Sequence, residues 1–271
     1  MKKLTLLAMV LLLVSSFCLP AAAAQKFEAA SGTAKIDGVM DDAYLAAPVI
    51  KIENYLKGSA KTKGTARVLW DSKNLYIFYD ITDPALSTTV DPSTSYIYKS
   101  DSVEFFVDLA SAPGKLTDIN AGQWTAYAPI AKANVGTWGG LGKHQTANKA
   151  NASYAAKVTE KGWTVEMQIP FGADYSPKAG AVISVVFHIN SDEDGAGGRD
   201  YEIFAGDAAG QEKAWSSTEN YDKLTLTSAK YTAPVKQEPT VSPATADAGV
   251  LAALASAVSA GAAVILSKKR K

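Results

Sequence analysis

The sequence predicts an all-β protein, built as an antiparallel β-sandwich, and three observations support this prediction. Several short segments alternate between apolar and polar side chains, which is the period of a strand with one buried face. Turn-forming glycine, proline, asparagine and aspartate residues separate these segments. No amphipathic helix is evident between the two ends of the chain, so sheet packed on sheet is the expected architecture.

A hairpin over residues 66–81 is the clearest element. Both limbs carry apolar side chains that are mostly β-branched or aromatic, and such residues favour strands. They are Val68, Trp70, Leu75, Ile77, Tyr79 and Ile81. The polar stretch Asp71-Ser72-Lys73-Asn74 supplies the turn, so the two limbs are expected to pair with each other.

The next strand, over residues 102–109, separates its side chains cleanly by parity. Val103, Phe105, Val107 and Leu109 share one parity, whereas Ser102, Glu104 and Asp108 share the other. Because successive side chains of a strand point to opposite faces, one face is expected in the core and the other in solvent. The exposed polar face is where a functional site could lie.

Further strands follow from the same alternation. They are expected over residues 124–127, 153–159, 163–169, 181–191, 201–204 and 223–227, with Glu160-Lys161-Gly162 as a hairpin turn. In the segment 181–191 the core parity belongs to residues such as Ile189, which places Ser184, His188 and Asn190 on the opposite face.

The tryptophans divide into two groups. Trp70, Trp124 and Trp163 lie in strands and are expected in the core. Trp215 lies in a polar stretch and is expected in an exposed loop, where it could contact a ligand. Trp138 lies in a glycine-rich loop and could be a platform at the rim of a site or an anchor of the loop.

The N-terminal residues 1–24 have the order of a secretory signal: Lys2 and Lys3, an apolar run, then Ala21 to Ala24. The single cysteine, Cys18, lies inside this segment. The exported protein is therefore expected to contain no thiol, which excludes disulfides, cysteine nucleophiles and thiolate metal sites. We expect the β-sandwich domain to occupy residues 25–228 and a Pro/Thr/Ala-rich spacer to follow over 229–246.

The C-terminal residues 247–271 predict a hydrophobic anchor helix. No charge occurs from Ala248 to Leu266, and the chain then ends in Lys268-Lys269-Arg270-Lys271. Just upstream, Ser242-Pro243-Ala244-Thr245-Ala246-Asp247 resembles the sorting signal of wall-anchored proteins of Gram-positive bacteria, with Ser242 and Ala246 where leucine and glycine are usual. We expect a secreted protein anchored at the bacterial cell surface, in the membrane or on peptidoglycan.

The charge of the exported part argues against nucleic acid as a partner. Once the cations of the two ends and Asp247 are removed, 21 of the 27 basic residues and 26 of the 27 acidic residues remain, so the net charge is near −5. A nucleic-acid-binding domain needs a surplus of basic residues.

Seven blocks follow one another along the sequence: K-I-D-G-V-M-D-D-A-Y (35–44), V-L-W-D-S-K-N-L-Y-I (68–77), T-D-P (82–84), D-S-V-E-F-F-V-D (101–108), G-W-T-V-E-M-Q-I-P (162–170), F-H-I-N-S-D (187–192) and W-S-S-T-E-N-Y-D-K-L (215–224). In this order they resemble carbohydrate-binding module family 9, a β-sandwich family often attached to xylan-degrading enzymes and related to the DOMON-like group.

The resemblance implies a slot in which Tyr98, where the family usually has tryptophan, and Trp215 sandwich a terminal sugar ring. It also implies that Glu104 and Asn190 bind the sugar's hydroxyls. Thr125 stands where the family often has arginine, a departure that bears on the identity of the ligand. The ligand implied is a poly- or oligosaccharide, xylan- or cellulose-derived, with surface-displayed glycoside hydrolases as possible partners.

Structural calcium is a further implication of the resemblance, because family members often hold it through loop carboxylates. The candidate ligands are Asp83, Asp101 and Asp192, with Asp194 nearby in the sequence. The alternative is that these are solvated surface carboxylates.

Three other functions make different demands on the sequence. A glycosidase needs two carboxyls roughly 5–9.5 Å apart, but Asp101 and Glu104 face opposite sides of their strand, and Glu104 and Asp108 are about 13 Å apart along it. We therefore expect a non-catalytic module, whose role in polysaccharide catabolism would be accessory. A haem-binding DOMON-type domain would need ligands such as Met40, Met167 or His188. A passive spacer would bind no small ligand.

Overall fold

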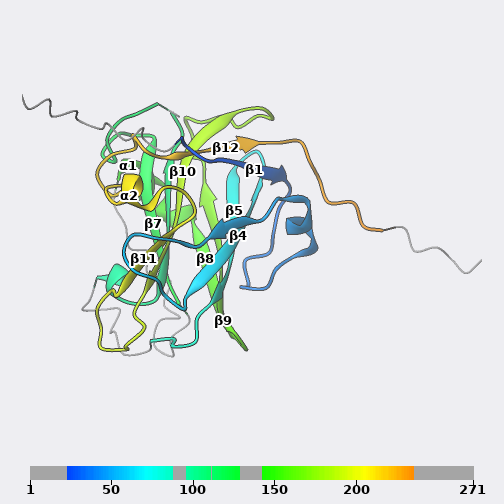
Figure 1. The fold of residues 1–271 in the computed structure, drawn as a ribbon. Coiled ribbons are helices and arrows are strands. Elements are labelled where there is room, and N and C mark those ends of the chain that lie inside the picture. Colours follow the sequence, from blue (N-terminus) through cyan, green and yellow to red (C-terminus); the bar gives the residue numbers. More distant parts are fainter. Residues whose placement is uncertain (1–22, 88–95, 111, 129–141, 235–271) are drawn as a thin grey trace, which may run out of the picture. The chain divides into compact units, whose positions relative to one another are not determined.

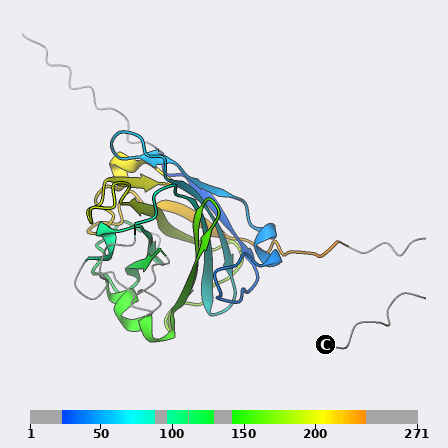
Figure 2. The ribbon, with the colours of Figure 1, turned by 90° about the horizontal axis from the view of Figure 1, so that it is seen from below.

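Strand β1 (Lys26–Ser31) belongs to both layers of a β-sandwich. Its residues Lys26 to Ala29 pair with β12, and Ala30 and Ser31 pair with β4, which lies in the other layer. The computed structural model describes residues 23–87, 96–110, 112–128 and 142–234, and within these ranges the sheet contains twelve strands. Figure 1 shows the layers from the side, and Figure 2 shows them from below. The predicted fold class is confirmed.

The first sheet is built around β10 (Val182–Ser191). Strand β6 pairs with one edge of β10, while β12 and β11 pair with the two ends of its other edge. Strand β7 extends the sheet beyond β6, and β3 extends it beyond β11. The bounds are β3 (Asn54–Tyr55), β6 (Ser102–Asp108), β7 (Ala121–Tyr127), β11 (Tyr201–Phe204) and β12 (Asp222–Leu226).

The second sheet has the order β2-β4-β5-β9-β8. Its bounds are β2 (Ile50–Ile52), β4 (Lys63–Trp70), β5 (Asn74–Thr82), β8 (Ser153–Thr159) and β9 (Gly162–Pro170). The predicted hairpin over 66–81 is confirmed as β4 and β5. Its turn is held by Asp71, whose Oδ1 accepts hydrogen bonds of 2.7 Å from the backbone N–H groups of Lys73 and Asn74.

The helices in the described part of the chain are all short. They are η1 (Asp42–Ala46), η2 (Ile97–Lys99), α1 (Lys143–Asn148), η3 (Lys149–Asn151) and α2 (Ala208–Gln211). Within the described ranges, no helix is long and apolar enough to cross a membrane. The predicted anchor over 247–271, the sorting-type motif over 242–247, residues 1–22 of the predicted signal over 1–24 and Trp138 lie outside the described residues. By its contacts the chain divides into two units, Met1–Thr232 and Ala233–Lys271, and every strand and helix above belongs to the first.

The main core fills the space between the two sheets. Trp124 and Trp163 are fully buried and Trp70 is 8 % exposed, so the expectation that these three tryptophans lie in the core is confirmed. Each large apolar side chain buried in this way contributes about 1.5–3 kcal/mol. The same core contains Met167 from β9 and Ile189 from β10.

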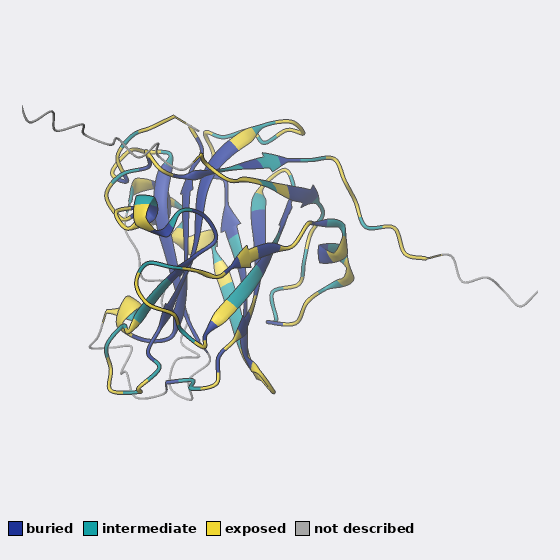
Figure 3. Ribbon diagram, in the orientation of Figure 1, coloured by how far each residue is buried: buried dark blue, intermediate teal, exposed yellow. Residues whose placement is uncertain are grey.

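The antiparallel sandwich contains one parallel strand, because β1 pairs in parallel with both β12 and β4. These partners are distant in sequence, so no hairpin connection requires an antiparallel arrangement. One expectation is wrong: the polar face of β6 is not exposed, since Ser102, Glu104 and Asp108 are all buried. Figure 3 shows the central strands of this sheet buried along their length.

A second apolar cluster explains why that face is covered. Phe106 and Val186 project from the polar face and pack against Phe204, Ala214 and Tyr221. The segment that contains α2 therefore folds over the outer side of the first sheet. Glu104 of β6 and His188 of β10 lie in the part of this interface that opens as a pocket.

Candidate functional site

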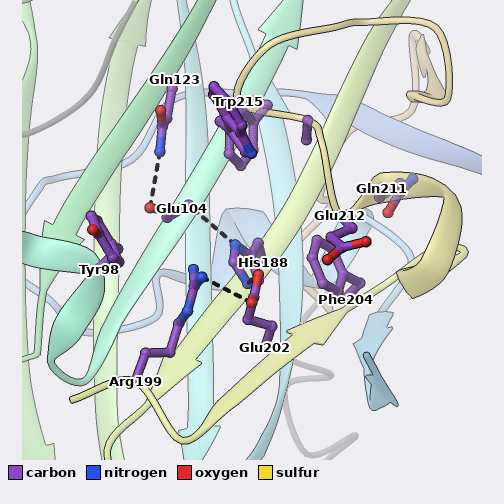
Figure 4. Close-up of a pocket in the computed structure, with 12 residues that line it drawn as sticks. Tyr98, Glu104, Gln123, His188, Arg199, Glu202, Phe204, Gln211, Glu212 and Trp215 are labelled. Carbon is purple, nitrogen blue, oxygen red and sulfur yellow. Dashed lines mark hydrogen bonds and ion pairs between the residues drawn. The ribbon is translucent and has the colours of Figure 1, made fainter. Parts of the chain in front are cut away.

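A pocket of about 380 Å³ lies on the outer side of β6 and β10. It is bounded by η2, by the loop between β10 and β11, and by the segment that follows α2. Figure 4 shows its lining side chains. Aromatic rings form part of its walls, and hydrogen-bonding groups form its floor, an arrangement typical of a small-ligand site.

The two exposed walls are Tyr98 and Trp215. Tyr98 lies on η2 and is 36 % exposed, whereas Trp215 lies in the loop after α2 and is 56 % exposed. Both line the pocket, although they are far apart in the sequence. In the view of Figure 4 the Glu104 carboxyl lies between them.

Each wall is held by its own neighbours. The Tyr98 ring stacks on Tyr96, with ring centroids 5.5 Å apart, and the Arg199 guanidinium lies 5.1 Å from its centroid. Trp215 follows Ala214, whose carbonyl accepts a hydrogen bond of 2.7 Å from the buried Tyr221 hydroxyl. The Trp215 side chain is therefore exposed on a backbone that is anchored to the second apolar cluster.

The floor is centred on the buried Glu104. Its Oε2 lies 2.8 Å from His188 Nδ1, and its Oε1 accepts a hydrogen bond of 2.9 Å from Gln123 Nε2. Burial acts to raise the pKa of Glu104, but the hydrogen bond and the charge of His188 outweigh it, so this pKa is lowered. Glu104 is therefore an ionised acceptor, suited to bind the hydroxyls of a ligand.

Arg199 supplies a cation to the pocket from the loop after β10. Its Nη1 donates to Asn190 Oδ1 at 3.0 Å, and its Nη2 forms an ion pair of 2.8 Å with Glu202. Asn190 is itself fixed by a hydrogen bond of 3.0 Å to Ser102 Oγ. Thr125 stands where an arginine was expected from the resemblance, but Arg199 supplies a cation to the site from another segment.

The structure brings three of the five predicted ligand-binding residues into the pocket: Tyr98, Glu104 and Trp215. Asn190 and Thr125 are buried behind the lining, where Asn190 supports Arg199 and Thr125 Oγ1 lies 3.5 Å from Glu104 Oε1. Asn190 and Thr125 therefore position lining residues, Arg199 and Glu104 respectively, and do not line the pocket themselves.

Sequence reasoning missed several lining residues. They are Gln123, His188, Arg199, Glu202, Phe204 and Glu212. The parity of His188 had placed it on the correct face of its strand. Arg199 and Glu212 lie in irregular segments, where no periodicity indicates a direction.

The candidate metal ligands lie at strand ends. Asp83, Asp101 and Asp192 are each at most 4 % exposed, so they are not solvated surface carboxylates. Asp101 accepts a hydrogen bond of 2.9 Å from the Asp192 N–H, and Asp83 accepts one of 3.0 Å from Trp163 Nε1. Burial, followed by the charges of Asp83 and Asp192, raises the pKa of Asp101 to about 7.

Asp192 has a free oxygen. Its Oδ2 accepts a hydrogen bond of 3.2 Å from the Gly197 N–H, but its buried Oδ1 has no partner among the described residues. One oxygen from each of Asp192, Asp194 and Asp200 lies within 4.8 Å of the others. Such a set of hard oxygen ligands fits a calcium ion.

The side chains considered for haem are differently placed. Met167 is buried in the main core, and Met40 is 41 % exposed. His188 lies on the outer side of the sheet, where its ring stacks on Phe204 at 4.2 Å. Its Nδ1 is engaged by Glu104.

Comparisons with known proteins agree on one family. The family model described as "Carbohydrate family 9 binding domain-like" matches residues 36–229. The chain is 30 % identical over 205 residues to "Exoglucanase XynX" of Acetivibrio thermocellus and 29 % identical over 206 residues to "Endo-1,4-beta-xylanase A" of Thermoanaerobacterium saccharolyticum. Each match covers 75 % of this chain, but only 17 % and 16 % of those proteins, respectively.

Two solved structures share the fold. Both are a family 9 carbohydrate-binding module from Caldicellulosiruptor kristjanssonii, one in complex with cellotriose and one with glucose. The TM-scores are 0.64 and 0.63, at 20 % and 19 % sequence identity. The matches cover 79 % and 78 % of this chain and the whole of the other chain.

Proposed function

The chain belongs to the carbohydrate family 9 binding domain-like family, and we propose that it holds a terminal sugar unit of a poly- or oligosaccharide between Tyr98 and Trp215. It is a non-catalytic module, and its match to the xylanases covers only a small part of their length. The observation that carries the proposal is that Tyr98 and Trp215 line one pocket with the ionised Glu104 at its floor.

The chemistry of a pyranose suits this pocket. Its ring faces carry C–H groups, which aromatic walls can remove from water. Its hydroxyls need partners, and Glu104, Gln123 and Arg199 offer an acceptor and donors. A site for one or two sugar units is expected to bind with about −4 to −8 kcal/mol, a dissociation constant from roughly millimolar to micromolar.

We infer that the ligand comes from cellulose or xylan. The solved neighbours are complexes with cellotriose and glucose, and the relatives are named as an exoglucanase and xylanases. The module would then hold a plant polysaccharide close to hydrolases displayed on the same surface. Its part in polysaccharide catabolism would be to concentrate substrate.

Titration with cello- and xylo-oligosaccharides tests this function. Tyr98→Ala and Trp215→Ala are each expected to weaken binding roughly tenfold or more, with little change in melting temperature, because both side chains are exposed. Lys213→Ala, in the same loop as Trp215, is the matched control and should bind normally. Unchanged binding by folded Tyr98→Ala and Trp215→Ala proteins would reject the slot and favour a passive spacer.

Structural calcium is proposed for the cluster around Asp192. Asp192, Asp194 and Asp200 would hold the ion, and Asp101 would position Asp192 through the hydrogen bond to its N–H. The support is the buried, unpartnered Oδ1 of Asp192. Calcium would neutralise the negative charge that Asp83 and Asp101 add nearby.

Display at the bacterial cell surface is also proposed, from the sequence features alone. The signal over residues 1–24 would direct export, and the tail over 247–271 would anchor the chain in the membrane or on peptidoglycan. Cell fractionation of a Gram-positive host expressing the full chain, with and without residues 242–271, tests this. Release of the shortened protein into the medium is expected, and equal retention of both forms would reject the anchor.

A further inference from the structure

The described lining of the pocket contains more carboxylates than cations. Glu104, Glu202 and Glu212 line it, whereas Arg199 is the only lysine or arginine among the lining residues that the structure describes. Arg199 is already paired with Glu202 at 2.8 Å. His188 is the other basic side chain of the described lining, and its Nδ1 is hydrogen-bonded to Glu104 Oε2 at 2.8 Å. Each of the basic groups is thus matched by a carboxylate, and one carboxylate remains.

That remaining carboxylate is Glu212. It follows α2 directly, is exposed, and forms no ion pair or side-chain hydrogen bond with any described residue. Figure 4 shows it on the side of the pocket away from Tyr98. Glu212 therefore places a carboxylate that has no cationic partner among the described residues beside the space that a sugar would enter.

From this charge distribution we propose that the pocket selects neutral sugars over uronic acids and that Glu212 is the residue that determines this specificity. The inference rests on the proposed sugar site between Tyr98 and Trp215. A neutral hexose offers the lining only hydroxyls, which carboxylates accept readily. The corresponding uronic acid has a carboxylate in place of one hydroxymethyl group, and this second negative charge would be repelled by Glu212.

Arg199 is the group that could reverse this preference. Its guanidinium has five N–H donors, and the bonds to Asn190 and Glu202 leave some of them free to face a ligand carboxylate. However, binding an anion there would require it to share the cation with Glu202, whose charge already neutralises Arg199. The described lining residues together would still carry a negative surplus.

The test compares the dissociation constants of the purified full chain for glucose, glucuronic acid and glucosamine at pH 7. Glucuronic acid is expected to bind roughly tenfold more weakly than glucose, and glucosamine at least as tightly as glucose. The ratio of the dissociation constant for glucuronic acid to that for glucose should fall toward one as salt is raised to about 0.5 M, because salt screens the repulsion.

Variants assign the effect to Glu212. Glu212→Gln should reduce discrimination against glucuronic acid roughly threefold, and Glu212→Lys should abolish it. Glu219→Gln, which removes a charge from the same loop outside this pocket, should leave the ratio unchanged. Equal or tighter binding of glucuronic acid by the wild type, or an unchanged ratio in Glu212→Gln, would overturn the specificity while leaving the sugar site intact. Binding of none of the three sugars would reject both.

Discussion

Glu104 of β6 and His188 of β10 face each other across adjacent strands and form a buried pair, with Oε2 and Nδ1 2.8 Å apart. The pair lies at the floor of the pocket, and Gln123 satisfies the second oxygen of Glu104. The same carboxylate that would bind a ligand is therefore fixed by two strands of the sheet. Its position does not depend on a loop, which is favourable for a binding group.

Replacing Glu104 with glutamine should destabilise the domain at pH 7 by about 1.5–3 kcal/mol, because a charge-assisted hydrogen bond in a buried site is lost. The lowered pKa of Glu104 means that the folded protein binds its proton less readily than the unfolded chain does. The stabilisation is thus complete above the ordinary value of 4.5 and is lost as the pH falls through the lower folded value.

Urea unfolding of the wild type and Glu104→Gln, compared at about pH 7 and pH 3, measures this difference. The two free energies of unfolding should converge at the lower pH. Glu28→Gln, the control, removes an exposed carboxylate from a strand and should leave the free energy of unfolding unchanged at both pH values. A difference that does not vary with pH would show that Glu104 is not ionised in the folded protein.

Removing the Arg199 guanidinium should weaken the binding of a neutral oligosaccharide about 5- to 10-fold. Arg199→Ala loses donors to the ligand and the contact with the Tyr98 ring, and it leaves Glu202 unpaired. Isothermal titration calorimetry gives the affinity. Lys99→Ala is the matched control, since it removes a cation over the neighbouring Tyr96 and not over Tyr98. Equal losses in the two variants would indicate a general charge effect.

The Tyr98 ring, rather than its hydroxyl, should supply the wall. Tyr98→Phe is expected to bind oligosaccharide within about twofold of the wild type, and Tyr98→Trp about two- to threefold more tightly, because a larger face is removed from water. No hydrogen bond from the Tyr98 hydroxyl occurs among the described residues, which is why its loss should matter little. A large loss in Tyr98→Phe, measured by the same titration, would assign the hydroxyl a direct role.

The strands and the exposure of Trp215 could be predicted from sequence because each depends on local information. Alternation placed Val103 in the core and Glu104 on the other face, and the polar surroundings of Trp215 indicated its exposure. The resemblance to a known family supplied Tyr98 as the opposite wall.

The remaining features depend on contacts between distant segments. Nothing in the alternation of β6 shows that the α2 segment will cover its polar face, with Phe106 packed against Tyr221. Likewise Arg199 lies in an irregular loop, and only the fold brings it to Tyr98 and Glu202. The parallel pairing of β1 unites the two ends of the domain and has no local signal.

Calcium should stabilise the domain through Asp192. Millimolar calcium added to the metal-free protein is expected to raise the melting temperature by roughly 5–10 °C, because an ion that binds only the folded state shifts the unfolding equilibrium. Asp192→Asn should abolish this rise, since it removes the negative charge of the buried side chain and replaces one of its two oxygens with an NH2 group. Asp174→Asn, at an exposed aspartate outside the cluster, should preserve it. Identical melting curves with calcium and with a chelator would reject the site, and a rise retained in Asp192→Asn would place the ion elsewhere.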